Sequence, residues 1–229
     1  KQTLALANVR STQQLFERYS SDNGRYPFRA AGDQPAGLEE PVEPNALTFS
    51  WYPEGVLLAT TNHFDLANLW PAIVADLDEW PGIAETWVSP GRAFELPELD
   101  DVMNGFEIEP GEMFSIVYSN SFVARPTLWM EDRGDSVDRI AELRPTRASE
   151  VRAPAGKVML WDRHLAYLSK EPERVGEHYR EKTPMAFADG HGSLEDPSEA
   201  SDGVANPLNG GDDTTLHNTS QGVYGIDYD

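Results

Sequence analysis

Histidine is the residue type of this chain best suited to bind a transition metal or to move protons near neutral pH, and five are present. None of them forms the His-Glu-x-x-His pattern of zinc peptidases, and there is no cysteine to complete a thiolate site. A metal site would need Asp162, His164, Asp189 and His191 to meet, with the strands that carry them side by side. The simpler interpretation is that the Asp-Gly and His-Gly pairs form turns, because aspartate and glycine tolerate turn geometry.

The signatures of several common enzyme classes are missing from the sequence. There is no Gly-x-Ser-x-Gly nucleophile motif, no glycine-rich phosphate loop and no dinucleotide fingerprint. Acid pairs such as Asp100-Asp101 and Asp212-Asp213 occur, but a chain with 39 acidic residues contains such pairs without any catalytic role. We therefore predict no enzymatic activity and no catalytic residues. A secreted hydrolase that uses two carboxylates is the least favoured of the functions we considered.

Aromatic residues offer a second kind of chemistry, which is binding. The six tryptophans could form a surface on which sugar rings stack, although tryptophan is more often a core or partly buried interface residue. Both interpretations stay open at the level of the sequence.

The charge of the chain excludes several partners. The 229 residues carry 18 basic and 39 acidic side chains, for a formal net charge of −21. From Thr183 onward every charged residue is acidic, if histidine is counted as neutral. Such a charge repels nucleic acid and anionic lipid and favours divalent cations. No apolar stretch approaches the roughly 20 residues of a membrane span.

Residues 3–22 have the clearest helical pattern in the chain. Asn23-Gly24 is a good C-terminal cap, and Pro27 prevents the helix from resuming. Apolar side chains spaced by three or four form the core-facing stripe: Ala5, Val9, Thr12, Phe16 and Tyr19, widened by Leu15. The outer side is expected to carry Gln2, Arg10, Gln13, Glu17 and Arg18.

Elsewhere the expected elements are short. The two clearest strands are 157–162 and 185–195, and the second is interrupted by a turn at Asp189-Gly190. An antiparallel sheet containing both strands, with the N-terminal helix packed across it, predicts an α+β fold. The remaining expectations are helices at 64–80 and 135–145, a strand at 82–92, a β-rich segment at 114–123, and short apolar runs within 47–61 separated by a turn at 53–55.

The end of the first helix resembles a known junction. Tyr19, followed by Asp22-Asn23-Gly24 and then by Arg25 and Tyr26-Pro27, is similar to the passage from helix to head in type IV pilin-like proteins and type II secretion pseudopilins. Segments 86–92, 114–122, 153–164 and 183–194 are similar, in order, to bacterial prepilin-type proteins with a signature of histidine, nine residues and Asp-Gly. That class has a Cys-Pro-Ser turn, whereas the segment from Trp87 to Pro90 contains no cysteine. Ten residues, instead of nine, lie between His178 and Asp189.

This resemblance implies a pilin-like organisation. Residues 1–24 would be the C-terminal half of the pilin-type helix, 25–196 an α+β head with long loops, and 197–229 an acidic tail of the head. The apolar half of the helix, which anchors such proteins in the inner membrane after a prepilin peptidase removes a leader, would lie upstream of Lys1. The implied partners are other pilin-like subunits, and the implied location is the periplasm or the cell surface.

Three functions are carried forward. The first is a structural subunit, a pseudopilin or minor pilin, of a surface filament or type II secretion-like apparatus. The second is an extracellular binding module that recognises a polysaccharide or a secreted substrate. The third is the secreted hydrolase.

The acidic tail raises the question of calcium. Related pseudopilins commonly hold calcium in a C-terminal loop, and the carboxylates of Asp202, Asp212 and Asp213 are interleaved with glycines that let a loop curl round an ion. We name these three aspartates as candidate ligands. The alternatives for residues 197–229 are a disordered tail, or one held by packing of Val223, Tyr224, Ile226 and Tyr228.

Overall fold

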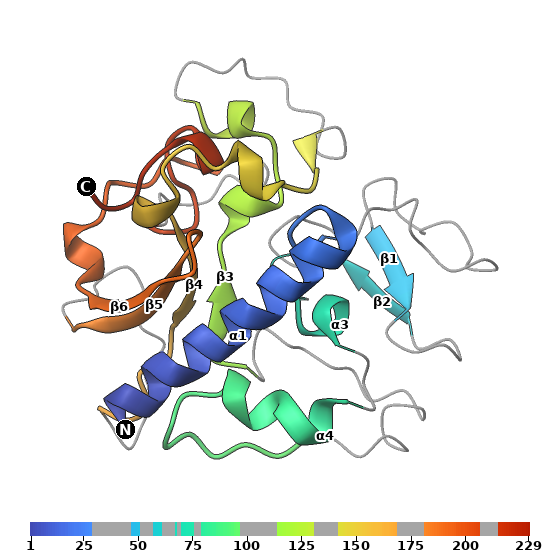
Figure 1. The fold of residues 1–229 in the computed structure, drawn as a ribbon, viewed down its shortest axis with the longest axis vertical. Helices are drawn as coiled ribbons and strands as arrows, with labels where there is room; N and C mark the ends of the chain where they lie inside the picture. The colour runs from blue at the N-terminus through green and yellow to red at the C-terminus, as the bar shows by residue number, and fades with distance from the viewer. Residues whose placement is uncertain are drawn as a thin grey trace.

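A long N-terminal helix, α1 (Gln2–Asn23), crosses one face of a four-stranded antiparallel sheet (Figure 1). This arrangement comes from a computed structural model, which describes residues 1–28, 47–50, 57–60, 67, 70–75, 79–96, 114–130, 142–168, 181–206 and 215–229. The expected α+β class is confirmed. Among the described residues no helix is both long enough and apolar enough to cross a membrane.

The sheet confirms the two strands that the sequence indicated most clearly. Its strands, in spatial order, are β3 (Ile116–Tyr118), β4 (Val158–Asp162), β5 (Thr183–Phe187) and β6 (Gly192–Glu195). Each strand is antiparallel to its neighbours. The turn between β5 and β6 lies at Asp189-Gly190, as predicted, with Gly190 at φ 96°, a conformation that favours glycine.

One face of α1 is buried against the sheet. Ala5, Val9, Thr12 and Phe16 are buried, as the apolar stripe predicted. The placement of Gln13 on the outer side was wrong, because its side chain is buried and its Nε2 donates to the carbonyl of Phe187 at 2.7 Å. An amide side chain can be buried at little cost when it makes such a bond, and this one ties α1 to the end of β5.

The helix ends where the sequence predicted. Gly24 adopts the left-handed conformation, with φ 69° and ψ 12°, and its N–H donates to the carbonyl of Ser20 at 2.8 Å. Tyr26 and Phe28 follow at once and are buried in the head. The chain therefore turns sharply from helix into core.

Replacement of Gly24 by alanine should lower the free energy of unfolding by about 1 kcal/mol, because a Cβ atom disfavours the left-handed conformation. A Cβ at this position meets no atom within 4 Å, so the cost comes from the backbone alone. Gly82 is the matched control, since a Cβ there is also unobstructed and its φ is not positive. Chemical denaturation of both variants checks the prediction, and equal stabilities would contradict it.

An aromatic core joins the buried face of α1 to β3 and to residues 70–75 and 79–87. The ring of Phe16 lies 5.4 Å from Trp70 and 4.9 Å from Tyr118. Trp87 contacts both Trp70, at 5.1 Å, and Trp80, at 5.7 Å, in edge-to-face geometry. The tryptophans of the described side chains are all buried, so they form the core and not a sugar-stacking surface: Trp70, Trp80, Trp87, Trp129 and Trp161.

The segment around these tryptophans differs from the prediction. Ala67 is helical, α3 spans Trp70–Val74, and α4 spans Trp80–Ile83, so Trp80 begins a second helix instead of ending a helix over 64–80. The strand expected at 82–92 was wrong, because η2 (Ala84–Trp87) continues from α4. Burial at positions 80, 84 and 87 has helical spacing, and it outweighs the β-prone composition.

Two other predicted segments lie only partly within the described residues. Residues 135–141 lie outside them. Glu142 is helical, as predicted, but Leu143 already forms an antiparallel bridge with Ala124, so the helix expected at 135–145 ends before Leu143 and not at Pro145. The apolar runs of 47–61 are two paired antiparallel strands, β1 (Leu47–Ser50) and β2 (Leu57–Thr60), and the turn at 53–55 lies outside the described residues. The described part of the chain also contains the single-turn helices η3 (Asn120–Phe122), η4 (Pro126–Trp129), η5 (Ala148–Glu150), η6 (Pro154–Gly156), η7 (Pro197–Glu199) and η8 (Gly222–Tyr224).

Candidate functional site: a buried polar network at the C-terminal segment

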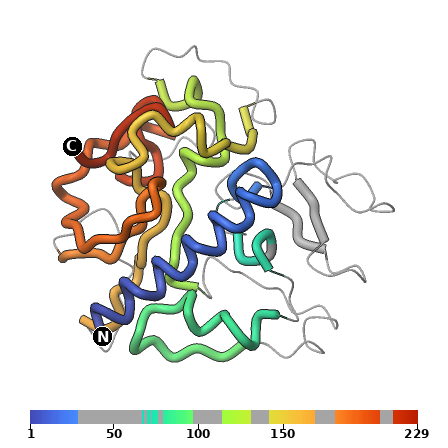
Figure 2. Tube along the Cα trace, viewed as in Figure 1, coloured from blue at the N-terminus to red at the C-terminus, as the bar shows by residue number. Residues whose placement is uncertain are grey.

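The C-terminal segment, residues 215–229, packs into the head (Figure 2). Leu216 and Val223 are fully buried, and Tyr228 packs against the buried cluster around Phe187. Packing by Val223 and Tyr228 was one of the alternatives for the tail, and for this segment it is confirmed. The N–H of Arg152 donates to the carbonyl of Val223, which fixes η8 beside residues 142–156.

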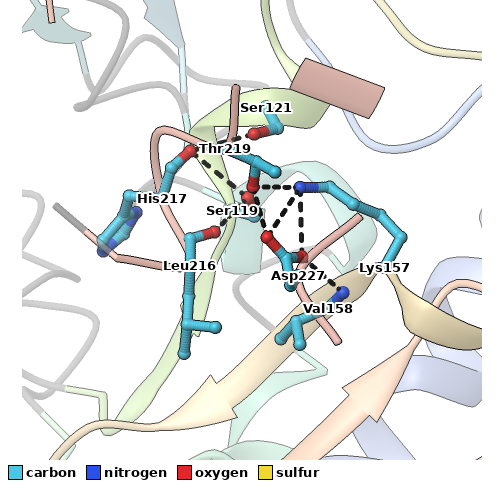
Figure 3. A network of polar contacts seen from close by, with 8 residues as sticks. All are labelled: Ser119, Ser121, Lys157, Val158, Leu216, His217, Thr219 and Asp227. Atoms are coloured by element: carbon cyan, nitrogen blue, oxygen red, sulfur yellow. Dashed lines mark hydrogen bonds and ion pairs between the residues drawn. The ribbon is translucent and has the colours of Figure 1, made fainter. Parts of the chain in front are cut away.

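A network of polar side chains lies beneath this segment (Figure 3). The hydroxyl of Ser119 donates to the carbonyl of Leu216 at 2.7 Å, and that of Ser121 donates to the carbonyl of His217 at 3.0 Å. Both serines are fully buried and follow β3 directly. The two hydroxyls thus provide hydrogen bonds to backbone carbonyls that lie outside the strands of the sheet.

The centre of the network is an ion pair. Lys157, which directly precedes β4, places its Nζ 3.1 Å from Asp227 Oδ2 and 3.3 Å from Oδ1. Nζ also donates to the hydroxyl of Thr219, which in turn donates to Asp227 Oδ1. Asp227 Oδ2 accepts the N–H of Val158 at 2.8 Å. Every polar atom of the pair therefore has a partner.

Burial decides the electrostatics of this pair. The side chains of Lys157 and Asp227 are 0% and 1% exposed. Desolvation lowers the pKa of the Lys157 ammonium, and the neighbouring charge of Asp227 offsets that shift in part. A charge taken out of water in this way is stabilised only by its partners, so removal of either residue leaves the other in an unfavourable state.

The His/Asp cluster considered from the sequence does not form. The strands β4 and β5 are neighbours, but they are antiparallel, with Val158 opposite Phe187 and Trp161 opposite Met185. Asp162 thus ends β4 at one end of the sheet, while Asp189 follows β5 at the other. Turn formation by Asp189-Gly190, the simpler interpretation, is what the structure shows.

Asp162 and His164 instead make buried contacts that hold the chain directly after β4. Asp162 accepts the backbone N–H of His164 at 3.0 Å and that of Leu165 at 3.3 Å. Burial raises the pKa of Asp162, although hydrogen bonds from Ser89 and these two amides act against the shift. The ring Nδ1 of His164 lies 2.8 Å from Ser115 Oγ.

The contact that Asp162 makes with His164 differs from that of the aspartate in a catalytic triad. In a Ser-His-Asp triad the carboxylate orients the histidine ring, whereas Asp162 binds the His164 backbone. The ring Nδ1 is instead 3.1 Å from the guanidinium of Arg92 and is shared with fully buried Ser115. Among the described residues no group of three or more His, Cys, Asp or Glu side chains could hold a metal ion.

The candidate calcium ligands fall on two parts of the chain. Asp202 is exposed, next to a bridge between Gly203 and Thr219. Asp212 and Asp213 lie outside the described residues, as does His178. The polar residues that the structure brings together were missed by the sequence analysis, because Lys157 and Asp227 are 70 positions apart and no local pattern links them.

Comparison with known proteins adds no assignment. No family model matches the chain, and neither the curated proteins nor the solved structures contain a match. The function must therefore be argued from the residues and their arrangement.

The pair formed by Asp189 and His191 gives a pH-dependent expectation. Asp189 Oδ1 accepts the N–H of His191 at 3.1 Å and lies 2.6 Å from its ring Nδ1, while the ring stacks on Phe187. Although partial desolvation raises the pKa of Asp189, these hydrogen bonds and the His191 charge lower it overall. A carboxyl with a lowered pKa stabilises the fold above its unfolded-state pKa, and that contribution is lost as the pH falls through the folded-state pKa.

The Asp189→Asn variant should therefore be less stable than the parent at neutral pH, by about 0.5–1 kcal/mol for such a partly exposed pair. The difference should shrink as the pH falls below about 4. Urea denaturation of both proteins at a series of pH values measures it. A difference that is constant with pH would show that the charge of Asp189 contributes nothing.

Proposed function

We propose that the protein is a pilin-like structural subunit, a pseudopilin or minor pilin, of a cell-surface filament or type II secretion-like apparatus. The observation that carries the proposal is the arrangement of α1. A single amphipathic N-terminal helix lies across an antiparallel sheet, ends at a left-handed Gly24, and continues into buried Tyr26. Gly24 and Tyr26 are among the residues on which the resemblance to pilin-like proteins rests.

The two sides of α1 support this role. The buried side fixes the helix to the head through Val9 and Phe16. The opposite side is exposed at Ala7 and Gln14, and Leu4 is 56% exposed. A helix that is held by one stripe can present the other to neighbouring subunits, which is how one element can serve both the head and the assembly.

The proposal has consequences for location, partners and chemistry. The protein would be anchored in the inner membrane before assembly and then lie in the periplasm or on the cell surface, with other pilin-like subunits as partners. It would carry out no catalysis. Recognition of polysaccharide by exposed tryptophans has lost its main support, since the tryptophan side chains that the structure describes are buried.

The proposal is tested in the source cell with the full gene product carrying an epitope tag. Surface material is sheared off and probed for the tag, with and without deletion of the prepilin peptidase. The expected result is tagged protein in the sheared fraction of the parent strain, and an unprocessed, cell-bound form in the deletion strain. Processing and release that are unaffected by the deletion would contradict the proposal.

Calcium in the tail belongs to the same proposal. If Asp202, Asp212 and Asp213 bind calcium, the ion stabilises the folded state by mass action, and the melting temperature should rise at millimolar calcium. Thermal unfolding in calcium and in chelator, at fixed ionic strength, measures this. The Asp202→Asn variant should show a smaller shift than the parent. Equal melting temperatures for the parent in both conditions would leave these residues as an acidic loop.

A further inference from the structure

The Lys157–Asp227 pair has the geometry of two groups that can join covalently. A lysine amine is a nucleophile once it is neutral, and the Asp227 carboxyl offers a carbon between two oxygens that lie 3.1 and 3.3 Å from Nζ. Both side chains are held from several directions, by Thr219, by the Val158 amide and by the surrounding core. The reacting groups are thus preorganised in one site, which greatly raises their effective concentration.

The burial of Lys157 favours the neutral amine that the reaction requires. A proton passed from the ammonium to the carboxylate converts two buried charges into a neutral amine and a carboxylic acid. The lowered pKa of Lys157 has the direction that this transfer needs. Water, which would stabilise the charges and hydrolyse the product, is kept out because both side chains are buried.

We propose that Lys157 and Asp227 form an intramolecular isopeptide bond that fastens the C-terminal segment to the sheet. Nζ attacks Cγ of Asp227, the Nζ–Cγ bond forms, and the Cγ–Oδ1 bond breaks. Oδ1 leaves as water with two of the three ammonium protons, and the third stays on the amide nitrogen. No atom is oxidised or reduced, and no co-reactant is needed.

Thr219 and Val158 have distinct parts in this step. Thr219 accepts from Nζ and donates to Oδ1, so its hydroxyl can relay a proton from the amine to the departing oxygen. The N–H of Val158 donates to Oδ2, the oxygen that becomes the amide carbonyl. That hydrogen bond is therefore kept in the product.

The bond would give this chain an internal covalent cross-link. With no cysteine, the protein cannot form a disulfide. An amide between two residues 70 positions apart would close a loop that reaches from β4 to the C-terminal segment. The inference does not depend on the proposed function, because it follows from the buried pair alone.

Intact mass spectrometry of the purified full chain, after incubation at neutral pH, tests the inference. The expected mass is lower than the sequence mass by one water molecule. Trypsin should then release residues 153–163 joined to residues 183–229, because a modified Lys157 is not cleaved. A parent protein at its full sequence mass, with no joined peptide, would overturn the inference.

Two variants sharpen the test. Lys157→Met should have its full sequence mass and yield no joined peptide. Thr219→Val keeps both reacting groups and should accumulate the joined peptide more slowly, whereas an unchanged rate would overturn the role of Thr219.

Succinimide formation at Asp189-Gly190 or Asp202-Gly203 also releases water, but it joins no two peptides, so the peptide map separates the two reactions. A water loss without the joined peptide counts against the isopeptide bond.

Discussion

Replacement of Phe16 by alanine should lower the free energy of unfolding by about 3–5 kcal/mol, one of the two largest effects that we expect. The ring is fully buried between α1 and the sheet, in edge contact with Tyr118 and tilted against Trp70. Its removal leaves a cavity where the helix, the sheet and the tryptophan cluster meet. Urea or guanidinium denaturation followed by tryptophan fluorescence and circular dichroism measures the loss.

Leu4 provides the control on the same helix. Its side chain is 56% exposed, so Leu4→Ala should change the stability by no more than about 0.5 kcal/mol. Both variants replace a large apolar side chain of α1 by alanine, and they differ in the face of the helix that they alter. Similar effects at the two positions would contradict the packing of α1 on the sheet through the Phe16 stripe.

Lys157→Met should be destabilising to a similar degree, by about 3–5 kcal/mol. The variant leaves the Asp227 carboxylate buried without a cation, whether the parent holds an ion pair or the amide that we infer. Of its partners in the described part of the chain, Asp227 would then keep Thr219 and the Val158 N–H. Equilibrium denaturation at neutral pH measures the difference.

The double variant Lys157→Met with Asp227→Asn separates charge from packing. Asparagine keeps an oxygen that can accept from Val158 and removes the buried charge. We expect the double variant to be more stable than Lys157→Met alone. If it is equally unstable or less stable, the unpaired charge of Asp227 is not the cause of the loss.

Local signals account for the parts of the fold that the sequence predicted. The stripe of Val9 and Phe16 repeats at helical spacing, and Gly24 marks the end of the helix, so α1 was predicted almost residue by residue. The hairpin of β5 and β6 was equally legible, because two runs of strand-forming residues flank Asp189-Gly190. In each case the information lies within a few residues of the element.

The errors come from two sources. Around Trp80, the sequence predicted the end of a helix followed by a strand, whereas burial of Ala84 and Trp87 in the aromatic core holds the segment helical. Tertiary packing there outweighs local propensity.

The second source is distance along the chain. The Lys157–Asp227 pair joins two residues whose local contexts, an apolar strand and a polar tail, give no sign of each other. Gln13 was misplaced for a related reason, since its partner is the carbonyl of Phe187. A helical wheel identifies polar side chains, but it cannot show that a distant backbone group will bind one of them.

The proposed function depends most directly on whether the exposed side of α1 contacts other subunits. Because the chain has no cysteine, single substitutions Ala7→Cys and Gln14→Cys in the full gene product give sites for cross-linking on the surface of the source cell. Ala155→Cys on η6, also exposed, is the matched control outside the helix. Our account predicts cross-linked species larger than the subunit from the two α1 sites and little from Ala155. Subunits that remain monomeric at both α1 sites, with the fold and the surface location intact, would contradict it.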